Sequence, residues 1–233
     1  MTPPATRPTV LSGLIEPLGD DGRLSAIAKR PALPPWRIGA LGLAGDMQAD
    51  TNHHGGPEKA LHQYPFEHYA DWADEIGDNP LLRTPGAFGE NLSTTEWTET
   101  NVCVGDVVRF GRALLQVSQG RQPCWKLNRR FAQPDMALRV QSSRRSGWYY
   151  RVLEAGMAEP GDFLRVVDRP RPEWSIERLH LLLYCDTHDR NGLASMAAMP
   201  ELAQNWRELA RQRVHSGKIE DWTRRLSGAE FSG

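Results

Sequence analysis

The segment covering residues 107–128 has the sequence VVRFGRALLQVSQGRQPCWKLN. It contains two short runs, Val107–Phe110 and Leu114–Ser118, whose composition is typical of β-strands. Gly111 and Arg112 separate the two runs, and such a short connection is typical of a β-hairpin. The segment therefore predicts two adjacent antiparallel strands.

Cys124 follows this hairpin. After the second strand the chain passes a glycine and a proline and enters a predicted helix over 125–131, so Cys124 lies at or near the helix N-terminus. Unpaired backbone N–H groups and the helix dipole favour a thiolate there. Four cations close in sequence add positive charge: Arg121, Lys126, Arg129 and Arg130. A stabilised thiolate is a nucleophile or a ligand for a soft metal, and a buried structural thiol is the alternative that stays open.

Further short strands are predicted on both sides of the hairpin. A strand over 10–15 is closed by the turn Gly19-Asp20-Asp21-Gly22, and 25–28 is its expected partner. The other predicted strands cover 36–38, 148–153 and 163–167. Many short strands with Gly and Asp turns favour a barrel or a sandwich.

One amphipathic helix interrupts the strands. Pro65 occupies the expected first helical position and Gly77 the expected end. The apolar stripe between them consists of Phe66, Tyr69, Ala70, Ala73 and Ile76. Its spacing predicts a helix that faces the core.

The composition changes at Arg169-Pro170-Arg171-Pro172, which suits a semi-rigid connector. Beyond it, three apolar stripes predict three short helices that pack on one another or on the barrel. The stripes are Ile176, Leu179, Leu182 and Leu183; Leu193, Met196 and Ala197; and Leu202, Trp206 and Leu209. Charges on the other faces, including Arg213 and Arg225, are expected to be solvated if the tail is purely structural.

The segment 52–62 is a candidate anion site. Gly55 and Gly56 allow positive φ and close approach of the backbone to a ligand. Their N–H groups, with Lys59, suit a phosphate, although an ordinary Gly-Gly turn with solvated histidines explains the same pattern. Adjacent His53 and His54 do not aim readily at one ion, so zinc is not expected.

A third segment, 85–93, places two glycines around Phe88 and follows them with Glu90 and Asn91. It is either a bulged strand or the wall of a pocket.

Composition limits the classes of function. The chain has 233 residues, 39% hydrophobic and 24% charged, which is enough to build a real core. The formal net charge of −1 gives no electrostatic indication of nucleic-acid binding. The N-terminus lacks the features of a signal peptide, and no apolar run is long enough to span a bilayer, so we expect a cytoplasmic protein without membrane contact. The three cysteines form no disulfide or zinc pattern, and Cys103 and Cys185 are expected to be structural.

The ordered motifs resemble those of MOSC domains, in particular the YiiM-like branch, which is the N-hydroxylaminopurine reductase type. The motifs are Gly55-Gly56-Pro57-Glu58-Lys59-Ala60, Phe88-Gly89-Glu90-Asn91-Leu92, Val104-Gly105-Asp106 and Arg121-Gln122-Pro123-Cys124. Each motif is short, and their joint order over about 10–226 makes the resemblance specific.

The resemblance implies an α+β fold, with a MOSC β-barrel-like domain over 1–170 and a three-helix C-terminal domain over 173–228. It implies a molybdenum cofactor of the molybdopterin type, with Cys124 as catalytic residue and metal ligand. The expected cofactor-binding residues are His54, Gly55, Gly56, Lys59, Gly89, Glu90, Asn91, Arg121 and Asn128. The implied activity is the reduction of N-hydroxylated bases or related N-oxygenated compounds to amines.

No GxGxxG follows a predicted strand, so a separate reductase protein is expected to supply the electrons. Two other functions stay open. Cys124 suits a sulfur carrier or cofactor-binding protein that forms a persulfide. A cysteine hydrolase using Cys124, His54 and Asn128 has the required residue types but no local signature.

Overall fold

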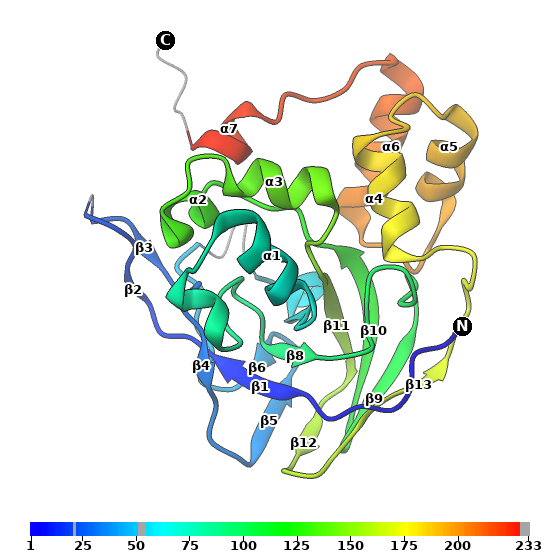
Figure 1. The fold of residues 1–233 in the computed structure, drawn as a ribbon. Coiled ribbons are helices and arrows are strands. Elements are labelled where there is room, and N and C mark those ends of the chain that lie inside the picture. The colour runs from blue at the N-terminus through cyan, green and yellow to red at the C-terminus, as the bar shows by residue number, and fades with distance from the viewer. Residues whose placement is uncertain (21, 51–54, 229–233) are drawn as a thin grey trace.

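A computed structural model describes residues 1–20, 22–50 and 55–228 (Figure 1). The strands are β1 (Thr9–Ser12), β2 (Glu16–Pro17), β3 (Leu24–Ser25), β4 (Arg30–Pro31), β5 (Trp36–Gly39), β6 (Gly42–Leu43), β7 (Leu61–Pro65), β8 (Leu92–Thr94), β9 (Val107–Phe110), β10 (Ala113–Gly120), β11 (Trp148–Glu154), β12 (Gly156–Ala158) and β13 (Leu164–Asp168). The helices are η1 (Pro57–Lys59), α1 (His68–Ile76), η2 (Pro80–Arg83), α2 (Lys126–Phe131), α3 (Met136–Ser143), α4 (Ile176–Tyr184), α5 (Arg190–Ala198), α6 (Gln204–Ser216) and α7 (Thr223–Ser227).

An eight-stranded sheet, in the order β13-β9-β10-β11-β7-β8-β1-β4, forms the frame of the molecule. All neighbouring strands in it are antiparallel except β7 and β8, which are parallel. The predicted hairpin is confirmed, since β9 pairs with β10 with Phe110 opposite Ala113.

The sheet curls into a half-barrel. Thr6, just before β1, exchanges backbone hydrogen bonds of 3.1 and 2.8 Å with Leu164 in β13, at the other end of the strand order. With the C-terminal helices this gives the expected α+β class. No described helix is both long enough and apolar enough to cross a bilayer.

Two local predictions were wrong. Pro65 ends β7 and lies opposite Thr94 of β8, so α1 begins only at His68. All five residues of β7 are buried, so the strand lacks the alternation that would have revealed it. The partner of β3 is β2, not β1, because β1 ends at Ser12 and pairs with β4 and β8.

The larger of two hydrophobic clusters joins the sheet to the C-terminal helices. It includes Val108 and Leu115 of the hairpin together with Leu179, Met196 and Trp206 of α4, α5 and α6. All five are essentially inaccessible to solvent. The sheet and the three predicted apolar stripes therefore share one core.

Backbone contacts reinforce this junction. The N–H of Ala203 donates to the carbonyl of Ser118 at 2.8 Å, and the N–H of Val104 donates to that of Trp174 at 2.8 Å. A Cβ on Gly120 would lie 2.2 Å from Nε2 of buried His180, so β10 and α4 approach each other as closely as glycine permits.

The smaller cluster lies among α1, α2 and α3, and five of its eleven buried members are aromatic. Tyr64 stacks on Phe88 with ring centroids 4.3 Å apart, and Phe88 contacts Phe131 at 4.9 Å. Trp72 is fully buried in the same cluster and donates from Nε1 to the hydroxyl of Tyr64 at 2.7 Å. Helix α7 lies over α2 and α3, apart from α4–α6 (Figure 1).

Candidate functional site

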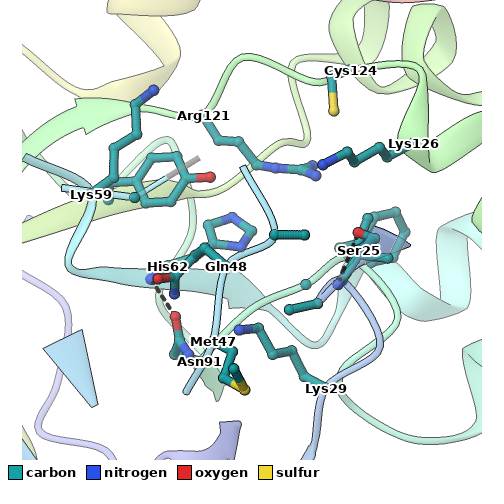
Figure 2. Close-up of a pocket in the computed structure, with 17 residues that line it drawn as sticks. Ser25, Lys29, Met47, Gln48, Lys59, His62, Asn91, Arg121, Cys124 and Lys126 are labelled. Atoms are coloured by element: carbon teal, nitrogen blue, oxygen red, sulfur yellow. Dashed lines mark hydrogen bonds between the residues drawn. The ribbon is translucent and has the colours of Figure 1, made fainter. Parts of the chain in front are cut away.

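A pocket lies where the strands β7 and β11, the loop after β10 and the loops 25–29 and 47–49 converge (Figure 2). It holds about 600 Å³, including the space at its mouth. The lining residues are Ser25, Ala26, Ile27, Lys29, Met47, Gln48, Ala49, Gly55, Lys59, His62, Phe88, Gly89, Asn91, Arg121, Cys124, Lys126 and Tyr149.

Cys124 projects its thiol into this pocket from the loop between β10 and α2, as Figure 2 shows. It is 9% exposed. Its carbonyl accepts the N–H of Leu127 at 3.0 Å, so it lies next to the first turn of α2, as the sequence predicts. The loop thus holds a nearly buried sulfur over a polar cavity.

Four cationic side chains line the pocket: Lys29, Lys59, Arg121 and Lys126. None of the described lining residues carries a carboxylate. Burial lowers the pKa of Lys59, and the nearby Cys124 and Asp50 charges partly offset this effect. Burial also lowers the pKa of Lys29, which is paired with Asp46 just outside the lining. A pocket of this charge attracts an anion.

Arg121 is the most deeply placed of these cations. Its backbone is fixed by a 3.0 Å bond from its N–H to the carbonyl of Gly147 and by a 2.9 Å bond from the Ser146 hydroxyl to its own carbonyl. The residue is 5% exposed, yet its Nη1 has no hydrogen-bond partner among the described residues. An unsatisfied buried guanidinium nitrogen is costly, so the geometry suits an anionic ligand that accepts from it.

His62 supplies a neutral ring to the floor of the pocket. Burial, followed by the positive charge of Arg121, lowers its pKa to about 3. Its ring lies 5.0 Å from that of Tyr149, and its Nε2 lies 3.3 Å from the carbonyl oxygen of Ser146. His62 therefore carries no charge near neutral pH. It forms part of the pocket wall without adding to the positive potential of the pocket.

Asn91 connects several parts of the pocket wall by hydrogen bonds. Its Oδ1 accepts the N–H of His62 at 3.1 Å. Its Nδ2 donates to Asp46 at 2.9 Å and to the carbonyl of Leu11 at 3.2 Å. One amide side chain thus connects β7, β1 and the carboxylate that pairs with Lys29.

Six of the expected site residues line the pocket: Gly55, Lys59, Gly89, Asn91, Arg121 and Cys124. His54 lies outside the described residues. Gly56 has the expected positive φ, 86°, but acts as the cap of η1 and is absent from the described lining.

Glu90 and Asn128 point elsewhere. Glu90 is fully buried and accepts from the N–H groups of Gly86 and Phe88 and from the hydroxyl of Tyr69. Asn128 donates to the carbonyl of Leu226 at 2.8 Å and accepts the N–H of Ala137 at 2.7 Å. Both side chains bond within the protein, and neither is among the described residues that line the pocket.

Sequence reasoning did not single out Lys29, His62 and Tyr149. Lys29 follows a short predicted strand and has no motif around it. His62 lies at the edge of the Gly-Gly segment, and Tyr149 follows Gly147-Trp148 in a strand. The only usable signal was their nearness to those motifs, since their convergence depends on strand pairing.

Comparison with known proteins identifies the family of this chain. Residues 50–165 match the MOSC domain, and residues 174–217 match the YiiM-like three-alpha-helix domain. The chain belongs to the MOSC-domain family. Within that family it has the YiiM-like domain arrangement, as the sequence motifs predicted.

Two relatives and one solved structure illustrate the similarity. Protein YiiM of Escherichia coli (strain K12) is 39% identical over 208 residues, covering 89% of this chain and 92% of that protein. A protein named reductase from Gibberella moniliformis is 37% identical over 221 residues, covering 92% of this chain and 39% of that longer protein. The crystal structure of YiiM from Escherichia coli superposes with a TM-score of 0.80 at 32% identity, covering 96% and 99% of the two chains.

Proposed function

We propose that this protein is an oxidoreductase that holds a molybdenum cofactor and reduces N-hydroxylated bases or related N-oxygenated compounds to amines. The observation that carries the proposal is the nearly buried Cys124 thiol facing a pocket of four cations. A thiolate is a suitable ligand for a soft metal, and a cationic cavity suits the phosphate of a pterin cofactor.

The donor set fits such a group. Among the described residues no cluster of three or more His, Cys, Asp or Glu side chains could hold a metal ion. A metal bound by Cys124 would therefore take its remaining ligands from a cofactor. The Nη1 of Arg121, which has no partner in the described part of the chain, would supply a buried donor for an anionic oxygen on that cofactor.

The protein residues would act by binding and orientation. Lys59, Arg121 and Lys126 would neutralise the phosphate, and the backbone at Gly55 and Gly89 would let the cofactor approach closely. His62 would remain neutral and hold the ring wall in place. When bound, the molybdenum cofactor supplies two-electron transfer of an oxygen atom.

Reduction of a hydroxylamine to an amine consumes two electrons and two protons and releases water. A separate reductase protein is proposed to deliver these electrons to this chain. The relative from Gibberella moniliformis that is named reductase supports a redox role. We propose that this protein acts on a small N-hydroxylated molecule at the mouth of the pocket.

A second candidate, a sulfur-carrier or cofactor-binding protein, would use Cys124 as a persulfide. The Cys124 thiol, which is 9% exposed and faces the pocket, also suits this role. The hydrolase alternative loses support, because the Asn128 amide is bonded to Leu226 and Ala137.

Cys124→Ser tests the proposal in protein produced in a host that makes the cofactor. We expect this variant to remain folded but to lose molybdenum and reduction of an N-hydroxylated base to background, because a hydroxyl is a poor ligand for a soft metal. Cys103→Ser and Cys185→Ser are the matched controls and should retain both. Full metal content in Cys124→Ser contradicts the proposal, and labile sulfur without molybdenum in the wild type favours the persulfide.

A further inference from the structure

The segment 222–228 lies against the loop that carries Cys124, although nearly a hundred residues separate them in sequence. It follows the three helices α4–α6 and contains α7. Figure 1 shows α7 over α2 and α3 rather than packed with α4–α6. The described chain thus returns from the helical tail to the pocket side.

Arg225 contacts the residues on both sides of Cys124. Its Nη1 donates to the carbonyl of Pro123 at 2.5 Å. Its own carbonyl accepts the N–H of Trp125 at 2.8 Å. The backbone before the cysteine and the backbone after it are therefore held by one residue.

The guanidinium of Arg225 is itself oriented. Its Nη2 donates to Oε1 of buried Gln141 in α3 at 2.6 Å, and its charge lies 6.0 Å from the centre of the Tyr184 ring. A guanidinium has planar, fixed donor directions, so the bond to Gln141 sets the direction of the bond to Pro123.

Two further contacts hold α7 in place. The Asn128 side chain of α2 donates to the carbonyl of Leu226 at 2.8 Å. Gly228 packs on the Trp125 ring so closely that a Cβ would lie 2.8 Å from it. Both contacts involve residues just after Cys124.

The connection from α6 to α7 is anchored to the tail helices. Glu220 accepts two bonds from Arg213 at 3.0 and 2.7 Å, and Arg213 is 3% exposed. Trp222 donates to Glu220 at 2.8 Å and packs edge-on against Tyr184 of α4. Arg213 and Arg225, expected to be solvated charges, are therefore structural ties.

We propose that Arg225 is a positioning residue for Cys124: it fixes the loop so that the thiol faces the pocket, and through α7 it makes the site depend on the tail. The contacts stand without any cofactor. Only the use of the positioned thiol as a metal ligand rests on the proposed function.

The test is the rate at which iodoacetamide alkylates each cysteine of the full-length, metal-free protein, followed by peptide mass spectrometry. In Arg225→Ala the loop loses the charged hydrogen bond to the carbonyl of Pro123, and the bond that ties this guanidinium to Gln141 of α3 is lost with it. The loop should therefore open more often, and Cys124 should react about tenfold faster. Cys185, which is exposed, should keep its rate. Arg224→Ala, which removes the exposed neighbouring arginine, is the matched control and should match the wild type.

Two further variants test whether the effect comes from the contacts of α7. Gly228→Val should displace α7 from Trp125 and accelerate the alkylation of Cys124 in the same way. Arg225→Lys can reach one acceptor but not both, so it should give an intermediate rate. A Cys124 rate within twofold of the wild type in both Arg225→Ala and Gly228→Val overturns the inference. A parallel rise at Cys124 and buried Cys103 also overturns it, because this indicates general unfolding. Absence of molybdenum from the wild type would contradict the proposed function and leave this result unchanged.

Discussion

The larger hydrophobic cluster joins the curled sheet to α4–α6, whereas the smaller cluster packs α1, α2 and α3 around Phe88. Phe88 also lines the pocket, and the residues that follow Cys124 enter α2, whose Leu127 and Phe131 belong to the smaller cluster. The first cluster is thus the larger of the two and joins the sheet to the tail, whereas the second supports the candidate site. Because the larger cluster contains buried residues from both sides of 169–172, the change in composition there marks a boundary in the sequence but not in the hydrophobic core.

Deleting residues 173–233 should have the largest effect. It removes the α4–α6 side of the shared core, including Leu179 and Trp206. The lost burial should exceed the roughly 5–15 kcal/mol that stabilises a typical protein. We expect no cooperative thermal transition by circular dichroism. A soluble monomer with a sharp transition would show that the sheet and its helices are independent after all.

A pair of core variants compares the clusters directly. Trp206→Ala and Phe131→Ala should each lower the free energy of unfolding by about 3–5 kcal/mol, because each leaves a cavity at a nearly inaccessible site. In urea titrations Leu138→Ala, at a 48% exposed site, should change it by less than about 0.5 kcal/mol. Only Phe131→Ala should also accelerate alkylation of Cys124. Equal acceleration in Trp206→Ala would erase the distinction between the clusters.

A pH titration should reveal one buried histidine in each region. Burial lowers the pKa of His62 in the pocket to about 3 and that of His180 in α4 to about 4. Both are lowered below the unfolded value, so the unfolded chain binds more protons and stability falls as the pH drops below about 6.5. From pH 7 to 5 each should remove on the order of 2 kcal/mol.

Guanidinium unfolding at pH 7 and pH 5 measures this loss. His180→Gln should remove the contribution of His180 to the loss of stability and so reduce the slope of the free energy of unfolding against pH. The wild-type slope should contain the contributions of both histidines. The same slope in both proteins would mean that His180 has the same pKa in the folded and the unfolded chain, which contradicts the prediction.

The smallest expected effects concern the pocket charges. Lys59→Ala and Lys126→Ala should each weaken the binding of inorganic pyrophosphate about tenfold, because each removes a cation near a multiply charged group. Isothermal titration calorimetry at low ionic strength measures the change. Arg139→Ala, at an exposed ion pair on α3, is the control and should bind as the wild type does. Unchanged binding in both lysine variants would place the anion elsewhere.

Much of the architecture could be predicted from local patterns. The hairpin at 107–118, the strand leading to a helix around Cys124 and the three C-terminal stripes all have clear periodicity. The parallel strands β7 and β8 were not predicted, because they are buried throughout and show no alternation. Gly56 shows what a motif can and cannot predict. Its positive φ was predicted from the Gly-Gly pair, but its position outside the described pocket lining was not.

Local sequence was enough to predict the hairpin at 107–118, the three C-terminal helices, the cysteine at the entrance to α2 and the motifs of the family, because these depend on residues a few positions apart. Which side chains meet became visible only in the folded chain. It brings Lys29, Lys59 and Arg121 to one cavity, turns Glu90 and Asn128 away from it, and sets Arg225 on Pro123 across 102 residues of chain. Such contacts arise from the pairing of strands and the packing of helices over long separations, and no local periodicity encodes them.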